Sequence, residues 1–352
     1  MDHLNVSMRK KISLWLLTML VLIVAIISIG GYTRLSNAGL SMVSWHPING
    51  TLPPLNQKEW TDKFNEYKKT PEFQTINYSI NIKEFQRIFL IEYIHRVFGR
   101  LVFMLYVIPM LYFIFKKNIK SVPHIFILLL FLTQSIIGWY MVKSGLYKYP
   151  HVSPYRLCIH LLLALVIYVC VYLQLLKNQP QVHKKIAYQN CKLFLSIFAL
   201  LLLFAQISVG ALVSGLKAGL VYNTWPLMDE KIVPSEFIYF YQKMINSSFT
   251  NFEILRDHAS MQFIHRILGY LVVFCNLVLS ITVFNNYKIV SMSLIVASVA
   301  QIILGIFAVL LSVPVWLGML HQFGAIVLIS LIVYINYNLI YNNKELSSFN
   351  HQ

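Results

Sequence analysis

The sequence predicts an all-α polytopic membrane protein, with eight transmembrane helices forming two parallel-repeat four-helix bundles. Of its 352 residues, 57% are hydrophobic and only 12% are charged, whereas soluble globular domains average about 25% charged residues. Several apolar runs reach the roughly 20 residues that a helix needs to cross the hydrocarbon core. Related phrases also recur in the two halves of the chain, so the same four-helix arrangement is expected twice.

The apolar runs define the expected spans, with ends placed to within a few residues. In chain order they cover residues 14–32, 88–115, 123–142, 157–176, 193–215, 260–284, 289–312 and 316–341. Basic residues precede the first run, as they would in a cleavable signal peptide. The run is long, however, and residues 30–34 offer no small-residue cleavage site, so a retained first helix is expected. Because no long Arg/Ser-rich leader precedes it, a bacterial inner membrane is favoured over an imported organellar protein.

The formal net charge of +16 does not indicate nucleic-acid binding, because the lysines and arginines lie mostly in loops between the expected spans. Basic loops are typical of membrane topology and of contact with anionic lipid head groups. The loops on the side of the N-terminus carry the higher density of lysine and arginine. This bias predicts that both termini lie in the cytoplasm.

The internal repeat relates residues 1–180 to residues 181–352. The phrase at 38–40 (Ala-Gly-Leu) matches that at 218–220, and the phrase at 94–99 (Ile-His-Arg-Val-Phe-Gly) matches Ile-His-Arg-Ile-Leu-Gly at 264–269. Each half contains four expected spans, an even number, so both repeats have the same orientation across the membrane. This parallel duplication differs from the inverted repeats common in secondary transporters.

Four histidines occupy matched places in the two repeats: His95, His160, His265 and His321. Each lies about three to seven residues inside its span, hence roughly 5–10 Å deep. Ionisable residues inside a membrane are costly and usually functional. A single histidine could merely bridge two helices by hydrogen bonding, but four at matched depth favour bis-histidine haem sites, the usual way in which a membrane bundle holds haem.

Glu92 is the only one of the 13 acidic residues placed well inside an expected span. It precedes His95 by three residues, so both side chains lie on one face of the helix. The second half has Gln262 at the equivalent place, which predicts proton chemistry in one pocket and cofactor binding alone in the other. As an alternative, Glu92 could be a simple ion-pair partner for a nearby arginine: Arg87, Arg96 or Arg100.

Two interpretations are open for the arginines that follow the paired histidines. Arg96 and Arg266 come directly after His95 and His265, and Arg100 lies one turn further along. Guanidinium groups suit carboxylates, so haem propionates are plausible partners. The alternative is that these side chains extend to the membrane interface or pair with acids in the loops.

Other potential ligands do not form a second site. A di-iron carboxylate centre needs two Glu-x-x-His pairs and two more glutamates, and the expected spans contain one carboxylate. Histidines outside the repeated phrases, at span edges or in loops, are expected to be structural or solvated: His46, His124, His151 and His258. Four cysteines are expected to be packing residues: Cys158, Cys170, Cys191 and Cys275.

These motifs resemble the haem A synthase family. Residues 92–100 (Glu-Tyr-Ile-His-Arg-Val-Phe-Gly-Arg) are similar to its first-half signature, and residues 39–42 with Trp45 and Pro53-Pro54 to its first outer loop. Residues 223–229 (Asn-Thr-Trp-Pro-Leu-Met-Asp) resemble its second-half loop, and residues 262–266 the helix that follows. The resemblance covers nearly the whole chain. It points to the proteobacterial and mitochondrial branch, which lacks the loop cysteine pair of the other bacterial branch.

The resemblance implies an enzyme that oxidises the C8 methyl group of haem O to the formyl group of haem A for cytochrome oxidase biogenesis. The oxidation passes through a hydroxymethyl intermediate, with water as the proposed oxygen source. By the family pattern, His265 and His321 ligate the iron of a resident haem b, while His95 and His160 flank the substrate haem, where Glu92 is required. Haem O synthase, cytochrome oxidase assembly factors, an unnamed electron acceptor, membrane lipid and a second copy of the chain are the partners to be expected.

Two other functions would also use four intramembrane histidines. A two-haem electron-transfer cytochrome explains the histidines but gives the difference between Glu92 and Gln262 no purpose. A haem carrier would likewise place its histidines near the outer face of the membrane.

Overall fold

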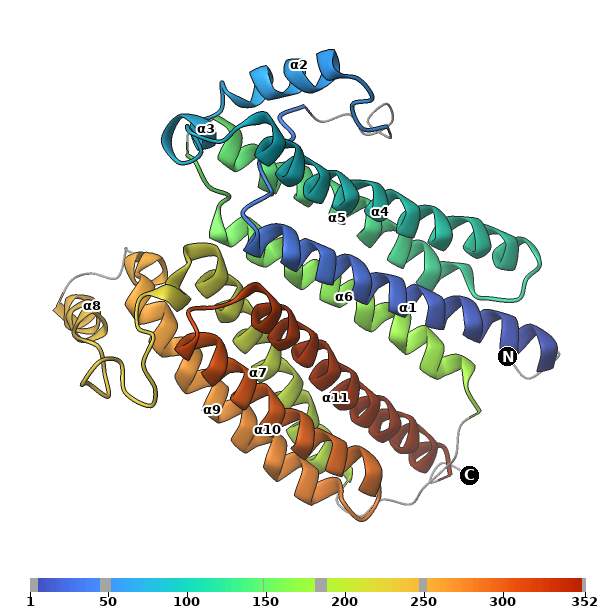
Figure 1. Cartoon of the computed structure of the whole chain (residues 1–352). Coiled ribbons are helices and arrows are strands. Elements are labelled where there is room, and N and C mark those ends of the chain that lie inside the picture. Colours follow the sequence, from blue (N-terminus) through green and yellow to red (C-terminus); the bar gives the residue numbers. More distant parts are fainter. Residues whose placement is uncertain (1–5, 45–51, 148, 181–188, 247–251, 350–352) are drawn as a thin grey trace. The chain divides into compact units, whose positions relative to one another are not determined.

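The computed structural model describes residues 6–44, 52–147, 149–180, 189–246 and 252–349, and these form helices joined by turns and loops (Figure 1). Eight of the described helices are long and apolar enough to cross a membrane. They are α1 (Val6–Leu35), α4 (Ile82–Phe115), α5 (Ser121–Tyr147), α6 (Pro154–Asn178), α7 (Gln189–Leu216), α9 (His258–Val283), α10 (Lys288–Leu310) and α11 (Val315–Phe349). The predicted all-α fold with eight spans is therefore confirmed.

Helix α4 begins six residues before the expected span. Asn81 caps it by accepting hydrogen bonds from the backbone N–H groups of Lys83 (2.9 Å) and Glu84 (3.1 Å), and the Glu84 carboxylate accepts from the Asn81 N–H (2.9 Å). This reciprocal arrangement is a capping box, which fixes a helix start through polar side chains. Hydropathy marks only the apolar part of such a helix, so the expected span at 88–115 covers α4 without its polar first turns.

Short helices outside the spans were expected as loops. They are α2 (Gln57–Tyr67), α3 (Pro71–Thr75) and α8 (Ser235–Asn246), with short 3₁₀ turns η1 (Ala218–Leu220) and η2 (Phe252–Arg256). In Figure 1, α2 and α3 lie beside the end of the helices at which α4 begins. The buried Tyr67 ring of α2 stacks on Phe85 of α4 with 5.2 Å between ring centroids. Aromatic packing therefore fastens this segment to α4 just before the helix enters its apolar part.

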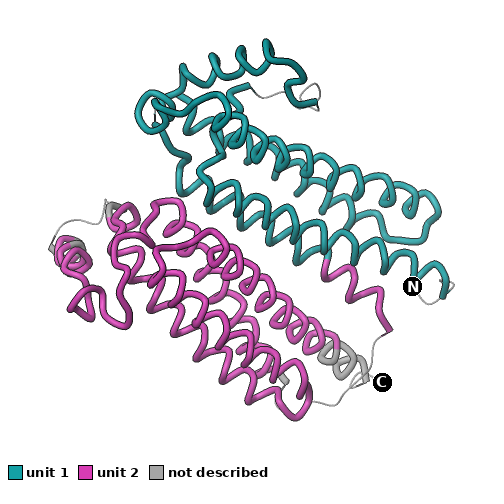
Figure 2. Tube along the Cα trace, viewed as in Figure 1, with its two compact units in different colours: residues 1–171 teal, residues 172–352 magenta. Residues whose placement is uncertain are grey.

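The chain divides into two compact units, residues 1–171 and residues 172–352 (Figure 2). In unit 2, α7 packs against α9 and α11, and α10 packs against the same two helices. This arrangement is a closed ring of four helices in which α9 and α11 face each other across the centre. A group held between α9 and α11 would therefore lie inside the bundle.

In unit 1, α1 packs along α4, and α5 packs on α4 and α3. The boundary between the units falls inside α6, so most of α6 belongs to unit 1. Helices α4 and α5 pack together less extensively than α9 and α10 do in unit 2. Unit 1 is therefore less closely packed along α4 and α5 than unit 2 is along α9 and α10.

Candidate functional site

The rings of His265 and His321 meet inside unit 2. They come from the facing helices α9 and α11, with 6.3 Å between ring centroids and 76° between ring planes. An imidazole–metal bond of about 2.0–2.1 Å, plus roughly 1.2 Å from the nitrogen to the ring centre, predicts about 6.4 Å between two axial imidazoles. The observed spacing fits one metal held between these two rings.

In unit 1, His95 lies in the first half of α4 and His160 near the start of α6. His160 is close enough to His95 for the two rings to interact electrostatically. In each unit, therefore, both histidines lie nearer to the beginning of their helices than to the end. We call this the histidine end of the unit.

Each of the four rings rests on a glycine of a neighbouring helix. A Cβ added at the glycine would lie 2.9–3.3 Å from the nearest ring atom. The pairs are Gly30 of α1 with His95, Gly138 of α5 with His160, Gly210 of α7 with His265, and Gly305 of α10 with His321. Small residues allow a side chain to enter between closely spaced membrane helices. The glycines thus provide the space in which the imidazoles lie.

The hydrogen bonding of the histidines is incomplete. The Nδ1 atoms of His160, His265 and His321 are buried and have no hydrogen-bond partner among the described residues. A buried polar atom without a partner costs free energy, and coordination to a metal would use a ring nitrogen of each side chain. The described residues contain no cluster of three or more His, Cys, Asp or Glu side chains around a common point. A bound metal would therefore need its other ligands from the group that carries it, as iron in a porphyrin has them.

Glu92 is buried, with 2% of its surface exposed, and binds the loop that follows α1. Its Oε2 atom accepts hydrogen bonds from the Ser41 N–H (2.8 Å), the Ser41 hydroxyl (2.7 Å) and the Met42 N–H (3.0 Å). Its Oε1 atom accepts from Arg96 Nη2 at 2.5 Å. The ion pair with Arg96 that the sequence left as an alternative is therefore present. A carboxylate has about four acceptor sites, and Glu92 receives four hydrogen bonds.

Gln262 occupies the equivalent place in unit 2 but offers different chemistry. Its Nε2 donates to the backbone carbonyl of Tyr222 at 2.9 Å, and its Oε1 has no partner among the described residues. The loop residue that aligns with Ser41 is Val221. Unit 2 therefore lacks both the carboxylate and the hydroxyl found in unit 1. The Ser41 contribution was not predicted, although the alignment of residues 38–40 with 218–220 contained its signal.

The arginines that follow the paired histidines bind the same loops. Arg96 donates to the carbonyls of Met42 (3.1 Å) and Ser44 (3.3 Å). Arg266 donates to the carbonyls of Tyr222 (3.1 Å) and Leu227 (3.4 Å). Both guanidinium groups thus fasten the loop at the histidine end of their unit. Haem propionates as further partners remain a prediction.

The Tyr222 side chain is held by a carboxylate outside the membrane-spanning helices. Its hydroxyl donates to the two carboxylate oxygens of Glu236, at 3.0 and 3.1 Å. Burial, together with this hydrogen bond to Glu236, raises the pKa of Tyr222. The loop of unit 2 is thereby fixed from α8 as well as from α9.

Three glutamines that were not predicted as site residues contact the histidine backbones. Each donates its side-chain N–H to a histidine carbonyl: Gln134 to His160 (3.0 Å), Gln206 to His265 (3.0 Å) and Gln301 to His321 (2.8 Å). The signal in the sequence is a Gln-x-x-x-Gly phrase that occurs in three spans, at 134–138, 206–210 and 301–305.

Among the other histidines that the structure describes, His124 does not join these pairs. His124 is buried in unit 1, where its Nδ1 lies 3.2 Å from the Tyr106 hydroxyl and its ring packs on Trp15. Two sequence predictions, for Trp45 and His46, fall outside the described residues.

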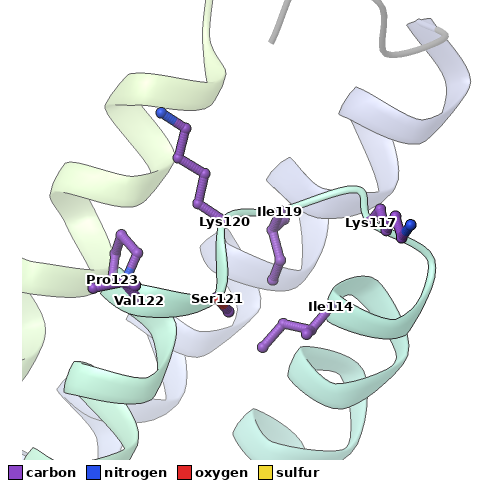
Figure 3. A pocket seen from close by; sticks show the side chains of 7 residues that line it. All are labelled: Ile114, Lys117, Ile119, Lys120, Ser121, Val122 and Pro123. Atoms are coloured by element: carbon purple, nitrogen blue, oxygen red, sulfur yellow. The ribbon is translucent and has the colours of Figure 1, made fainter.

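An open hollow of about 600 Å³ lies at the turn between α4 and α5 (Figure 3). Its lining includes Lys117 and Lys120 and none of the four paired histidines, and it lies at the far end of α4 from His95.

Comparison with known proteins gives consistent matches over the whole site. A sequence profile of cytochrome oxidase assembly proteins matches residues 13–333. Haem A synthase from Rickettsia africae (strain ESF-5) is 40% identical over 335 residues, which cover 93% of this chain and 97% of that protein. The protein of the same description from Rickettsia akari (strain Hartford) is 40% identical over 337 residues, covering 93% and 98%. That from Rickettsia bellii (strain RML369-C) is 39% identical over 345 residues, covering 96% and 100%.

Proposed function

Because the chain belongs to the haem A synthase family of cytochrome oxidase assembly proteins, we propose that unit 1 binds haem O and oxidises its C8 methyl group to the formyl group of haem A. The observation that carries the assignment to unit 1 is the buried Glu92–Ser41 pair, which unit 2 replaces with Gln262 and Val221. Conversion of a methyl group and water to a formyl group releases four protons and four electrons. A pocket for this reaction needs a group that accepts protons, and unit 1 has one.

In unit 1, His95 and His160 flank the substrate haem, and Glu92 accepts protons through Ser41. The Ser41 hydroxyl lies 2.7 Å from the Glu92 carboxylate and is itself buried. A hydroxyl can accept a proton from one neighbour while it donates its own to another. The four donors around the carboxylate leave little room for the substrate to approach Glu92 directly. Ser41 can instead pass a proton to Glu92. Water supplies the oxygen atom in this proposal.

In unit 2, His265 and His321 hold a resident haem b. The 6.3 Å spacing of their rings supports this role. When bound, haem b supplies a one-electron redox centre. Gln262 and Arg266 keep the loop at residues 222–227 in place at the histidine end of this unit.

We also propose that the protein lies in a bacterial inner membrane with both termini in the cytoplasm. Eight spanning helices and bacterial relatives support a multi-pass membrane protein, and the loop charges support the orientation. The histidine ends of both units would then lie near the outer surface. Haem O synthase, assembly factors for cytochrome oxidase and a second copy of the chain are proposed partners.

A reconstitution assay tests the proposed reaction. The full chain is placed in phospholipid vesicles with haem O and a soluble one-electron oxidant in H₂¹⁸O, and the extracted haems are identified by mass. We expect haem A or its hydroxymethyl precursor, each carrying ¹⁸O. Unchanged haem O beside a haem b that is reversibly reduced would instead support the two-haem cytochrome, the alternative that the ring spacing of His265 and His321 also fits.

The glycine beneath His265 provides a first test of the pocket in unit 2. In Gly210→Val, the added side chain would meet the His265 ring, because the Cβ alone would lie 2.9 Å from Cε1. We expect the displaced ring to lose its iron, so that about one of the two haems per chain disappears from the absorption spectrum. Leu201→Val, at an exposed position earlier on the same helix, is the control for a new valine in α7 and should keep both haems. Full haem content in Gly210→Val would contradict the proposed ligation.

A further inference from the structure

The same pair of contacts holds three of the four histidines. A glutamine donates to the histidine carbonyl at 2.8–3.0 Å, and a glycine one turn further along the same helix faces the imidazole. Residues four apart lie on one face of a helix, so the backbone and the ring of each histidine are fixed by one surface. Contacts of this kind link α5 to α6, α7 to α9, and α10 to α11.

The glutamine bond restricts how the histidine helix can move. Inside a bilayer, a side-chain hydrogen bond between helices holds two segments where water offers no competing partner. The bond fixes the carbonyl of the histidine relative to the neighbouring helix, and the imidazole is attached to the same residue. Loss of the bond would let the helix shift or turn, and the ring nitrogen would move with it.

The fourth histidine lacks this support. Helix α1 has Gly30 against the His95 ring, but Ile26 stands four residues earlier, where the other three helices have glutamine. The isoleucine side chain has no hydrogen-bond donor, so α1 cannot hold the His95 carbonyl in the same way.

The His95 ring is also turned differently. Its Nε2 is the atom nearest to a Cβ placed on Gly30, at 3.3 Å. In the other three pairs the nearest atom is Cε1, followed by Nδ1. Two independent features, the missing glutamine and the ring orientation, therefore single out one histidine.

We propose that Gln134, Gln206 and Gln301 are positioning residues that lock His160, His265 and His321 onto haem iron, and that His95 is the ligand that detaches. This inference rests on the proposed function, because it assumes that the four histidines face haem. Turnover would account for the difference between His95 and the other three histidines. A resident haem stays between two locked imidazoles, whereas a substrate haem must enter and a product haem must leave, and this is possible only if one ligand releases readily.

Carbon monoxide binding to the reduced protein tests the proposal without relying on enzyme activity. Carbon monoxide binds a six-coordinate iron only after one axial imidazole has detached. The full chain, loaded with haem in both pockets and reduced, is mixed with carbon monoxide, and the absorption change is followed over time. We expect one rapid phase, from unit 1, and one phase that is at least tenfold slower, from unit 2.

Two variants should change these phases in opposite directions. Gln206→Met removes the donor from unit 2 at similar side-chain volume and should speed the slow phase at least tenfold. Ile26→Gln supplies the missing donor in unit 1 and should slow the rapid phase at least tenfold. Leu22→Gln, one turn earlier on α1, is the control for a new polar side chain and should leave both phases unchanged.

The outcomes separate this proposal from the proposed function. If both haems are bound, and are lost in His265→Ala and His160→Ala, but Ile26→Gln leaves the rapid phase unchanged, the positioning role is overturned. The gain of a bond in Ile26→Gln remains informative even if Gln206→Met fails to fold. If the histidine variants keep both haems, the haem assignment itself is wrong, whatever the carbon monoxide kinetics show.

Discussion

Replacing Glu92 with glutamine should lower haem A formation by about 10²–10⁴-fold, the usual contribution of a general acid or base. Glutamine keeps the shape of the side chain but cannot take up a proton at neutral pH. Haem content and the absorption spectrum should stay as in the unaltered chain, because the imidazoles are untouched. Haem A and haem O extracted from membranes are measured by chromatography and mass. Normal haem A yield from Glu92→Gln would refute the role of Glu92 as a base.

The contacts of Glu92 make a second variant necessary. Glu92 also fastens the loop at Ser41 and Met42, so lost activity could reflect a displaced loop. Arg96→Met removes the bonds to Met42 and Ser44 and the ion pair with Glu92, but keeps the carboxylate. If Glu92 acts on protons, Glu92→Gln should be at least tenfold more damaging than Arg96→Met. Ser41→Ala, which removes the hydroxyl and keeps the backbone N–H, should resemble Glu92→Gln if Ser41 passes the proton.

Replacing His321 with alanine should remove one of the two bound haems and abolish haem A formation. His321 is one of only two protein ligands proposed for the iron in unit 2. The decrease in haem A formation in this variant should exceed the roughly 10–100-fold decrease in metal affinity or activity that is typical when a hydrogen-bond partner of a metal ligand is removed. Haem per chain is measured after extraction, and the absorption of the remaining haem is compared with that of the unaltered protein.

The corresponding change in unit 1 gives the control for this prediction. His160→Ala should remove the other haem and leave the spectrum of the unit 2 haem in place. If His321→Ala and His160→Ala removed the same haem, the histidines would pair differently from the pairs proposed within each unit. A full complement of haem in His321→Ala would exclude it as an iron ligand.

Hydropathy alone was enough to predict the eight spans, because a run of about 20 apolar residues has few other uses. It could not predict α2 or α3, whose residues are mostly polar and whose structure depends on contact with α4. Phe85 illustrates the limit. Its burial against Tyr67 and Phe64 brings together residues about 20 positions apart, and no local pattern records that contact.

The candidate site could be predicted where a short phrase recurs in both halves of the chain, and where the two copies of such a phrase differ. The four histidines and the contrast between Glu92 and Gln262 followed from aligned phrases. The partner of Glu92 did not, because Ser41 lies 51 residues away in the chain. The Gln-x-x-x-Gly phrases were visible in the sequence, but their meaning depended on which helix each one faces, and only the structure places Gln206 beside His265.

The central claim is that each unit holds one haem between its own two histidines. Low-temperature electron paramagnetic resonance of the oxidised full chain, saturated with haem, tests this claim most directly. The account predicts two low-spin ferric signals typical of bis-imidazole ligation, of which His321→Ala removes one and His160→Ala the other. A single haem per chain, or a high-spin signal from either unit in the unaltered protein, would contradict it.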